Sequence, residues 1–227
     1  SYGPVSTTSF DNAQDVVTLP NGQMVFCGTA GTSGNLEMCV VRLNADGTID
    51  NTFGTNGYYL HSNPSGSDFA YDMEVLANGQ ILIAGALSIT AANPQFALVC
   101  LNSNGTLNTS FGTNGVSAND IDASEDYARK ILLSSTHITL VGSSKLPGFT
   151  TNRIAATRCD LNGLLDLSFG TAGKTTLSNG NSNMTYSACW ASNNDIVVCG
   201  DAYISNTYYP MMAKMTSSGA AVTTFGT

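Results

Sequence analysis

Leu-Asn-Ala-Asp-Gly-Thr-Ile-Asp-Asn-Thr-Phe-Gly-Thr-Asn-Gly, residues 43–57, is the stretch that decides the fold, because related copies of it return three times. The copies occupy residues 101–115, 159–173 and, in a more divergent form, 215–227. Their Phe-Gly pairs begin at Phe53, Phe111, Phe169 and Phe225, at separations of 58, 58 and 56 residues. A period of this length is typical of repeat proteins whose units bury their faces on one another. We therefore expect one domain of four units, about 1–54, 55–112, 113–170 and 171–227.

Each unit contains a short apolar run that ends in glycine. The four runs are Met24 to Gly28, Ile81 to Gly85, Ile138 to Gly142 and Ile196 to Gly200. They are too short for helices, rich in β-branched residues and show little alternation, which is typical of strands covered on both faces. A first strand and a two-residue turn precede each run, and Asn21-Gly22 and Asn78-Gly79 are strong hairpin signals.

Beyond each closing glycine the sequence predicts a variable loop, a third strand that leads into the repeated stretch, and a short fourth strand. The loops expected are 29–35, 87–94, 143–151 and 201–208. No stretch keeps helical spacing over three turns, so an all-helical solenoid is excluded. The fold class expected is all-β, a β-propeller of four four-stranded blades. Residues 4–9 resemble the fourth strand that the last unit lacks and are predicted to close the ring. The first alternative is half of an eight-bladed propeller, in which two chains complete one ring. The second alternative is that the four units belong to a longer array.

The repeated stretch also carries a family resemblance. Arg42 to Gly57, preceded by Pro20-Asn21-Gly22-Gln23 and an apolar strand, resembles the bacterial delta-60 repeat, and the resemblance extends over all four units. It implies a β-propeller, usually within large secreted or surface proteins of bacteria, with no established catalytic activity or substrate. Two departures stand out: Cys100 occupies the position of Arg42, and Val222 the position of Asp50.

Composition narrows the classes of partner. Charged residues make up only 11% of the chain and the formal net charge is −8. A surface of neutral polar residues favours a protein displayed outside the cell. Eight Lys and Arg residues are too few to neutralise a nucleic acid, so we expect no nucleic-acid partner. No apolar run of about 18 residues is present, which predicts no membrane insertion.

Candidate catalytic and metal-binding residues are scarce. The six cysteines form no Cys-x-x-Cys pair, and whether any of them form disulfides stays open, Cys27 with Cys39 being thinkable across a turn. The Asn and Asp residues of the repeated stretch are interpreted as turn residues that bond their own backbone rather than as calcium ligands. His61 and His137 lie in different units without a neighbouring nucleophile. We expect no metal, no cofactor and no enzyme, although carboxylates from different blades would leave an extracellular hydrolase as an alternative.

Binding is the function that the pattern favours. Propellers bind ligands at the mouth of the central channel, where one residue from each blade converges. Thirteen residues before each closing glycine stand Asp15, Asp72, Arg129 and Ser187. A second candidate is the group of aromatic residues in the last unit, above all Tyr208 and Tyr209 with Tyr203, because exposed aromatic side chains stack on sugars or partner proteins. Trp190 and Tyr186 are expected to fill the blade core.

The function expected is therefore that of a secreted or surface-displayed bacterial binding module without catalysis. A lectin-like carbohydrate-binding propeller is the first alternative and an extracellular hydrolase the second. The partner expected is a protein or a glycan, which the sequence does not identify further. A second copy of the chain, in a homodimer that completes an eight-bladed ring, is the other partner considered.

Overall fold

The chain forms four antiparallel sheets that follow one another along the sequence. The computed structural model describes residues 11–32, 35–62, 66–90, 93–178 and 182–225, and within these ranges it contains fifteen strands and no α-helix. The first sheet has the order β1 (Asn12–Thr18), β2 (Met24–Thr32), β3 (Asn35–Leu43) and β4 (Tyr58–His61). The second has the order β5 (Phe69–Val75), β6 (Ile81–Thr90), β7 (Asn93–Leu101) and β8 (Val116–Asn119).

The third sheet contains β9 (Asp126–Leu133), β10 (His137–Lys145), β11 (Asn152–Asp160) and β12 (Lys174–Leu177). The fourth contains β13 (Ser182–Trp190), β14 (Ile196–Ile204) and β15 (Thr207–Met215). The all-β class is thus confirmed. Each of the first three sheets has four strands, and the described part of the last sheet has three. The proposed fourth strand of that sheet, residues 4–9, lies outside the described residues.

Asparagine and aspartate side chains hold the turns, as the sequence predicts. Gly22 adopts φ +84°, and its N–H donates to the Leu19 carbonyl at 2.9 Å. In the repeated stretch the Asp50 carboxylate accepts the Thr52 N–H at 3.0 Å. Asx side chains that bond the backbone two residues on are a common way to stabilise such turns. These contacts confirm the interpretation of the acidic positions as turn residues.

At the closing glycines the backbones of two neighbouring strands approach each other closely. A Cβ added to Gly85 would lie 1.8 Å from the Phe69 carbonyl oxygen, so only glycine fits there. The chain does not leave the sheet at this point. The loops predicted after each glycine are largely wrong, because β2, β6, β10 and β14 all continue past it and pair with the next strand. In a hairpin the backbone N–H and C=O groups of these residues hydrogen-bond to the next strand. In an irregular loop the same groups would have to hydrogen-bond to water.

The core lies between consecutive sheets. β5 packs on β1, β2 and β3; β9 packs on β5, β6 and β7; and β13 packs on β9, β10 and β11. Each interface buries one apolar cluster. Phe53 is fully buried in the first of these clusters, and Phe111 and Phe169 are buried at the next two. The phenylalanine of the repeat is therefore the anchor of one sheet on the next.

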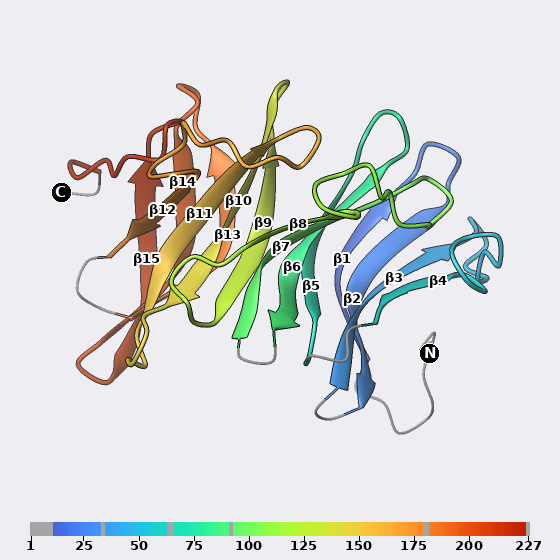
Figure 1. Cartoon of the computed structure of the whole chain (residues 1–227), viewed down its shortest axis with the longest axis horizontal. Helices are drawn as coiled ribbons and strands as arrows, with labels where there is room; N and C mark the ends of the chain where they lie inside the picture. Colours follow the sequence, from blue (N-terminus) through green and yellow to red (C-terminus); the bar gives the residue numbers. More distant parts are fainter. Residues whose placement is uncertain (1–10, 33–34, 63–65, 91–92, 179–181, 226–227) are drawn as a thin grey trace.

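The four sheets stand in an open row rather than a closed ring (Figure 1). The first sheet and the last lie at opposite ends of the row, since each sheet packs only on its sequence neighbours among the pairs with substantial contact in the described residues. A ring of four closed within one chain is therefore not formed by the described residues. A fourth apolar cluster, built around Cys39 and Val41, lies on the first sheet, outside the interface with the second sheet.

Candidate ligand-binding surface

The first strand of every sheet carries a bulge opposite the closing glycine. The pairing shifts by one residue there, which leaves one residue on each first strand without a partner across the ladder. The four bulge residues are Gln14, Tyr71, Arg129 and Tyr186. Bulges turn a side chain away from its regular direction and often lie beside functional sites. These four positions form a structurally equivalent series that passes from sheet to sheet.

The predicted series Asp15, Asp72, Arg129 and Ser187 is wrong by one residue in the third unit. Asp15, Asp72 and Ser187 pair with the residue before the closing glycine, but in the third sheet Lys130 takes this place, opposite Val141. The cause is a shorter turn. A hydrogen bond joins Leu19 N–H to the Gln23 carbonyl in the first unit, whereas the third unit closes from Ser134 N–H to the His137 carbonyl.

The two aspartates of this series join neighbouring sheets. The Asp15 carboxylate accepts the Met73 N–H at 3.0 Å, and the Asp72 carboxylate accepts the Ile131 N–H at 2.7 Å. Lys130 Nζ lies 2.6 Å from the other oxygen of Asp72. Burial raises the pKa of Asp72, while Lys130 and the Ile131 N–H act against that rise. Both carboxylates thus have a structural contact, and a ligand-binding role for them stays a prediction.

Arg129 instead lies among aromatic rings. Its guanidinium carbon is 3.8 Å from the centre of the Tyr71 ring and 5.6 Å from that of Tyr127. Phe69 stacks beside Tyr71 and meets Tyr127 edge-on. Burial raises the pKa of Tyr127 to about 12, so this phenol stays protonated near neutral pH. The guanidinium lies over the Tyr71 ring and near the Tyr127 ring, and these contacts stabilise the arginine in place.

A groove of about 830 Å³ lies at Tyr186, the last of the four bulge residues. The bulge residue Tyr186 is 55% exposed, and its hydroxyl donates to the Asp201 carboxylate at 2.9 Å. Tyr203 and Tyr208 also line the groove, with ring centres 4.8 Å apart. Asn152, Ser182 and Met184 are also among the lining residues. We call this site the tyrosine groove, defined by Tyr186, Asp201, Tyr203 and Tyr208.

The groove contains one of the two predicted tyrosines. Tyr208 lines it and is 66% exposed, whereas Tyr209 is exposed but is not among the lining residues. Both lie on β15 rather than in a loop. Tyr186 was expected in the core, and that expectation is wrong because its bulge directs it outwards. The alignment of Tyr186 with Tyr71 could have revealed this, had the bulge been recognised. Trp190 does pack on the core, and its indole N–H donates to the Leu133 carbonyl at 3.0 Å.

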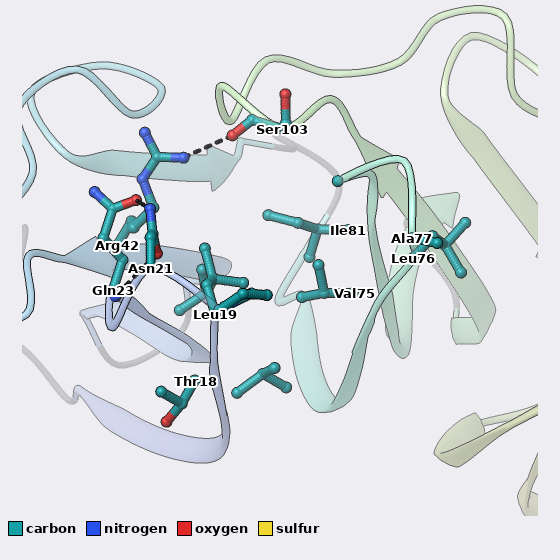
Figure 2. Close-up of a pocket in the computed structure, with 14 residues that line it drawn as sticks. Thr18, Leu19, Asn21, Gln23, Arg42, Val75, Leu76, Ala77, Ile81 and Ser103 are labelled. Carbon is teal, nitrogen blue, oxygen red and sulfur yellow. Dashed lines mark hydrogen bonds between the residues drawn. The ribbon is translucent and has the colours of Figure 1, made fainter.

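A second cavity lies between the first two sheets (Figure 2). Its volume is about 560 Å³, and its apolar lining includes Leu19, Val75 and Ile81. Arg42 borders it, but the guanidinium is already engaged by the Asp50 carboxylate at 2.7 Å and the Ser103 carbonyl at 2.7 Å. The polar groups at its rim therefore join the sheets, and we assign this cleft no ligand.

Several other titratable groups form ion pairs that hold the fold. In the acidic loop before β9, Asp122 pairs with Arg153 and Glu125 with Lys145. His137 contacts the Thr136 hydroxyl and Asp166, but Asp166 already pairs with Arg158 at 2.7 Å. Within the described ranges no three His, Cys, Asp or Glu side chains gather as metal ligands would. In the same ranges there is no helix of the length and apolarity needed to cross a membrane.

The cysteines occur as free thiols. Cys27, Cys39, Cys100 and Cys159 are buried, whereas Cys189 and Cys199 are exposed. The disulfide considered between Cys27 and Cys39 is not formed, since Cys27 pairs with Val40 across the hairpin and Cys39 pairs with Gly28. Burial raises the pKa of the Cys39 thiol to about 12, which keeps it protonated and unreactive.

A comparison with protein-family models matches parts of the first two units. A family model described as a β-propeller domain of unknown function (DUF5122) matches residues 19–53 and 76–111. These two segments run from the turn after the first strand to the Phe-Gly of the repeated stretch, in the first and second units. No curated protein matches the chain.

Proposed function

We propose that the four sheets are blades of a β-propeller of the delta-60 repeat type, and that the chain is a binding module without catalysis. The propeller family match in the first two units and the repeated stretch in all four support the blade assignment. The packing of each first strand on the preceding sheet is the arrangement by which blades follow one another around an axis.

The single observation that carries the binding role is the tyrosine groove. Tyr186, Tyr203 and Tyr208 are 55%, 39% and 66% exposed, yet each lies on a strand of a rigid sheet. Exposed tyrosines offer a large contact area and a hydroxyl at little cost in conformational entropy, which is why they are enriched at interfaces. Asp201 adds a charged acceptor to the same groove. The surface therefore suits an extended peptide segment of a partner protein.

A carbohydrate is the second candidate ligand. The same groove places stacking rings beside Asp201 and Asn152, whose side chains can hydrogen-bond to sugar hydroxyls. Catalysis has less support. Asp126 is buried and Asp72 pairs with Lys130, so neither is placed as a general acid beside the groove.

The test presents the purified protein to a peptide array and to a glycan array in parallel. Saturable binding to peptides supports the protein-interaction module, and binding to one glycan class supports the lectin. In either case Tyr186→Ala and Tyr208→Ala should abolish binding. Leu167→Ala, which removes an equally exposed apolar side chain from the repeated stretch of the third unit, outside the groove lining, should leave it unchanged. Binding that survives both tyrosine substitutions would exclude the groove as the site. Turnover of any arrayed ligand would contradict the non-catalytic role.

We further propose that the protein works outside the bacterial cell. The low charged fraction and the net charge of −8 support this placement. Fractionation of cells with an antibody against the native protein tests it, and recovery in the cytosolic fraction would contradict it.

A further inference from the structure

The last sheet leaves uncovered the positions that the other sheets bury against a neighbour. The residue before the closing glycine is fully buried in the first three units, as Cys27, Ala84 and Val141, whereas its equivalent Cys199 is exposed. Across the hairpin from these four residues stand Val40, Leu98, Ala156 and Met212. The first three are fully buried, and Met212 is 64% exposed. The outer face of the fourth sheet is thus an interface face without its neighbour.

The first sheet shows the complementary gap. Met73, Ile131 and Ala188 occupy one equivalent position on the first strands of the second, third and fourth sheets, and they are 1%, 1% and 7% exposed because the preceding sheet packs on them. Val16 has the same position on β1 and is 60% exposed. On the same sheet Cys39 and Val41 are buried, with half-buried Met24, Phe26 and Leu60 packed against them, so the exposed apolar surface at this end lies at β1 and these flanking side chains. This end of the row is therefore an apolar face of the type that receives a preceding sheet.

The two ends of the row also carry complementary polar groups, a cation at one end and a carbonyl acceptor at the other. Arg42 Nη1 donates to the Ser103 carbonyl of the next sheet, and Arg158 Nη1 donates to the Ser217 carbonyl of the next, at 2.7 and 2.6 Å. The fourth sheet supplies Lys214 at the position of Arg42, and the first sheet supplies the Ala45 carbonyl at the position of Ser103. One end of the row carries the cation and the other carries the acceptor.

On this evidence, and on the proposal that the sheets are blades, we infer that a second copy of this chain covers both ends. The last sheet of each copy packs on the first sheet of the other, which closes a ring of eight blades with two-fold symmetry. Each contact joins different surfaces, as in any head-to-tail assembly, and the ring closes after two copies. A second copy is the occupant favoured, because one chain carries both complementary faces and holds them at opposite ends of its row (Figure 1). Eight blades lie within the range that propellers adopt.

The ring would also complete the tyrosine groove. The next bulge residue after Tyr186 in such a ring is Gln14 of the partner subunit, so the bulge series continues without interruption around the axis. A ligand seated at Tyr186 would then contact both copies. Dissociation of the ring should weaken ligand binding even where every residue of the groove is intact.

Light scattering on the eluting protein peak tests the inference with a pair of charge variants. The wild-type chain should have a mass of twice 23.6 kDa. Met212→Arg and Val16→Asp should each halve the mass, because each places one charge in an apolar interface. An equal mixture of the two variants should restore the doubled mass, since arginine and aspartate then face each other at one interface and the other interface is wild-type. Phe149→Arg changes a side chain of similar exposure away from both ends and should leave the mass doubled.

Thiol labelling in the same samples separates the possible failures. In the two-chain ring Cys189 and Cys199 should be protected in the wild-type protein and react in Met212→Arg. A wild-type mass of 23.6 kDa with both thiols reactive would overturn the second copy and leave the blades and the tyrosine groove standing. The same mass with both thiols protected would show that the chain closes on itself and would also overturn the inference. Failure of the array experiment, in contrast, bears on the groove alone.

Discussion

β6 of the second sheet and β14 of the fourth have closely similar sequences and different surroundings. Ile81-Leu82-Ile83-Ala84-Gly85 and Ile196-Val197-Val198-Cys199-Gly200 are both apolar throughout. Every residue from Ile81 to Leu87 is buried, whereas burial alternates along β14. The second sheet has a neighbour on each face and the fourth has one only in the described structure. Burial in a repeat array is therefore a property of the neighbours, and equivalent substitutions in the two sheets should differ in cost.

The largest difference is expected for the anchoring phenylalanine. Phe169 is fully buried against Gly219 of the next sheet, whereas Phe225 is 36% exposed. Phe169→Ala should lower the free energy of unfolding by about 4 kcal/mol, and Phe225→Ala by less than about 1 kcal/mol. Urea unfolding in dilute solution, where separate chains do not assemble, measures both. Equal losses would mean that the fourth sheet is covered even in a single chain.

Leu98 and Met212 provide the next comparison. They occupy the same position on β7 and β15 and are 0% and 64% exposed. Leu98→Ala removes buried methyl groups and leaves a cavity, so a loss of about 3 kcal/mol is expected. Met212→Ala should cost less than about 0.5 kcal/mol, since its side chain loses little contact. The same dilute unfolding experiment measures them, and a loss at Met212 that grows with protein concentration would point to the second copy.

The third and fourth sheets should also differ in how their stability depends on pH, because one carries a buried aspartate where the other carries an asparagine. Asp126 of the third sheet corresponds to Asn183 of the fourth, and both side chains are buried. Burial raises the pKa of Asp126 to about 6. The folded state therefore holds a proton that the unfolded state releases between about pH 4 and pH 6, and stability falls as pH rises through that window. Asp126→Asn should raise the free energy of unfolding by up to about 2 kcal/mol at neutral pH and change it little near pH 4.

The Asp126 carboxylate accepts the Ile121 N–H at 2.7 Å, a contact that an asparagine oxygen can keep. Asp122→Asn is the matched control in the same loop. It breaks the ion pair with Arg153 and should lower stability at neutral pH. Thermal unfolding of both variants across this pH range gives opposite signs if burial of Asp126 is the cause. A loss of stability in Asp126→Asn at neutral pH would contradict that account.

These comparisons also show what the sequence could predict. The Phe-Gly period and the apolar runs were enough for four sheets and their order along the chain, because each repeats a local pattern with one structural solution. The burial of the phenylalanines between sheets became visible only in the structure. The position of Arg129 was not predictable by counting, since the turn before His137 is one residue shorter and the bulge moves with it. Tyr186 was missed because the bulge that turns its side chain outwards was not recognised in the sequence. Ring closure depends on the small rotation between sheets, which no residue pattern in a single unit specifies.

The smallest difference is expected between Arg158 and Lys214, which occupy the same position in the third and fourth units. Arg158 contacts the Asp166 carboxylate at 2.7 Å, donates to the Ser217 carbonyl at 2.6 Å and lies over the Phe169 ring. Lys214 contacts Asp195 of its own sheet at 2.9 Å. Arg158→Gln should therefore cost about 1 kcal/mol, because it leaves a carbonyl and a carboxylate without their partner.

Lys214→Gln should cost less than about 0.5 kcal/mol in dilute solution, because Lys214 makes an ion pair with Asp195 of its own sheet, whereas Arg158 joins two sheets. The Arg158 variant has a second signature. The Ser168 hydroxyl and Arg158 hold the pKa of Asp166 at about 2, so loss of the guanidinium should move that pKa upward and bring acid unfolding to higher pH. Lys214→Gln should leave the acid midpoint of Asp166 unchanged. If both variants lost the same stability, the arginine would act within its own sheet, and the contact with Ser217 would not be what distinguishes an inner sheet from the terminal one.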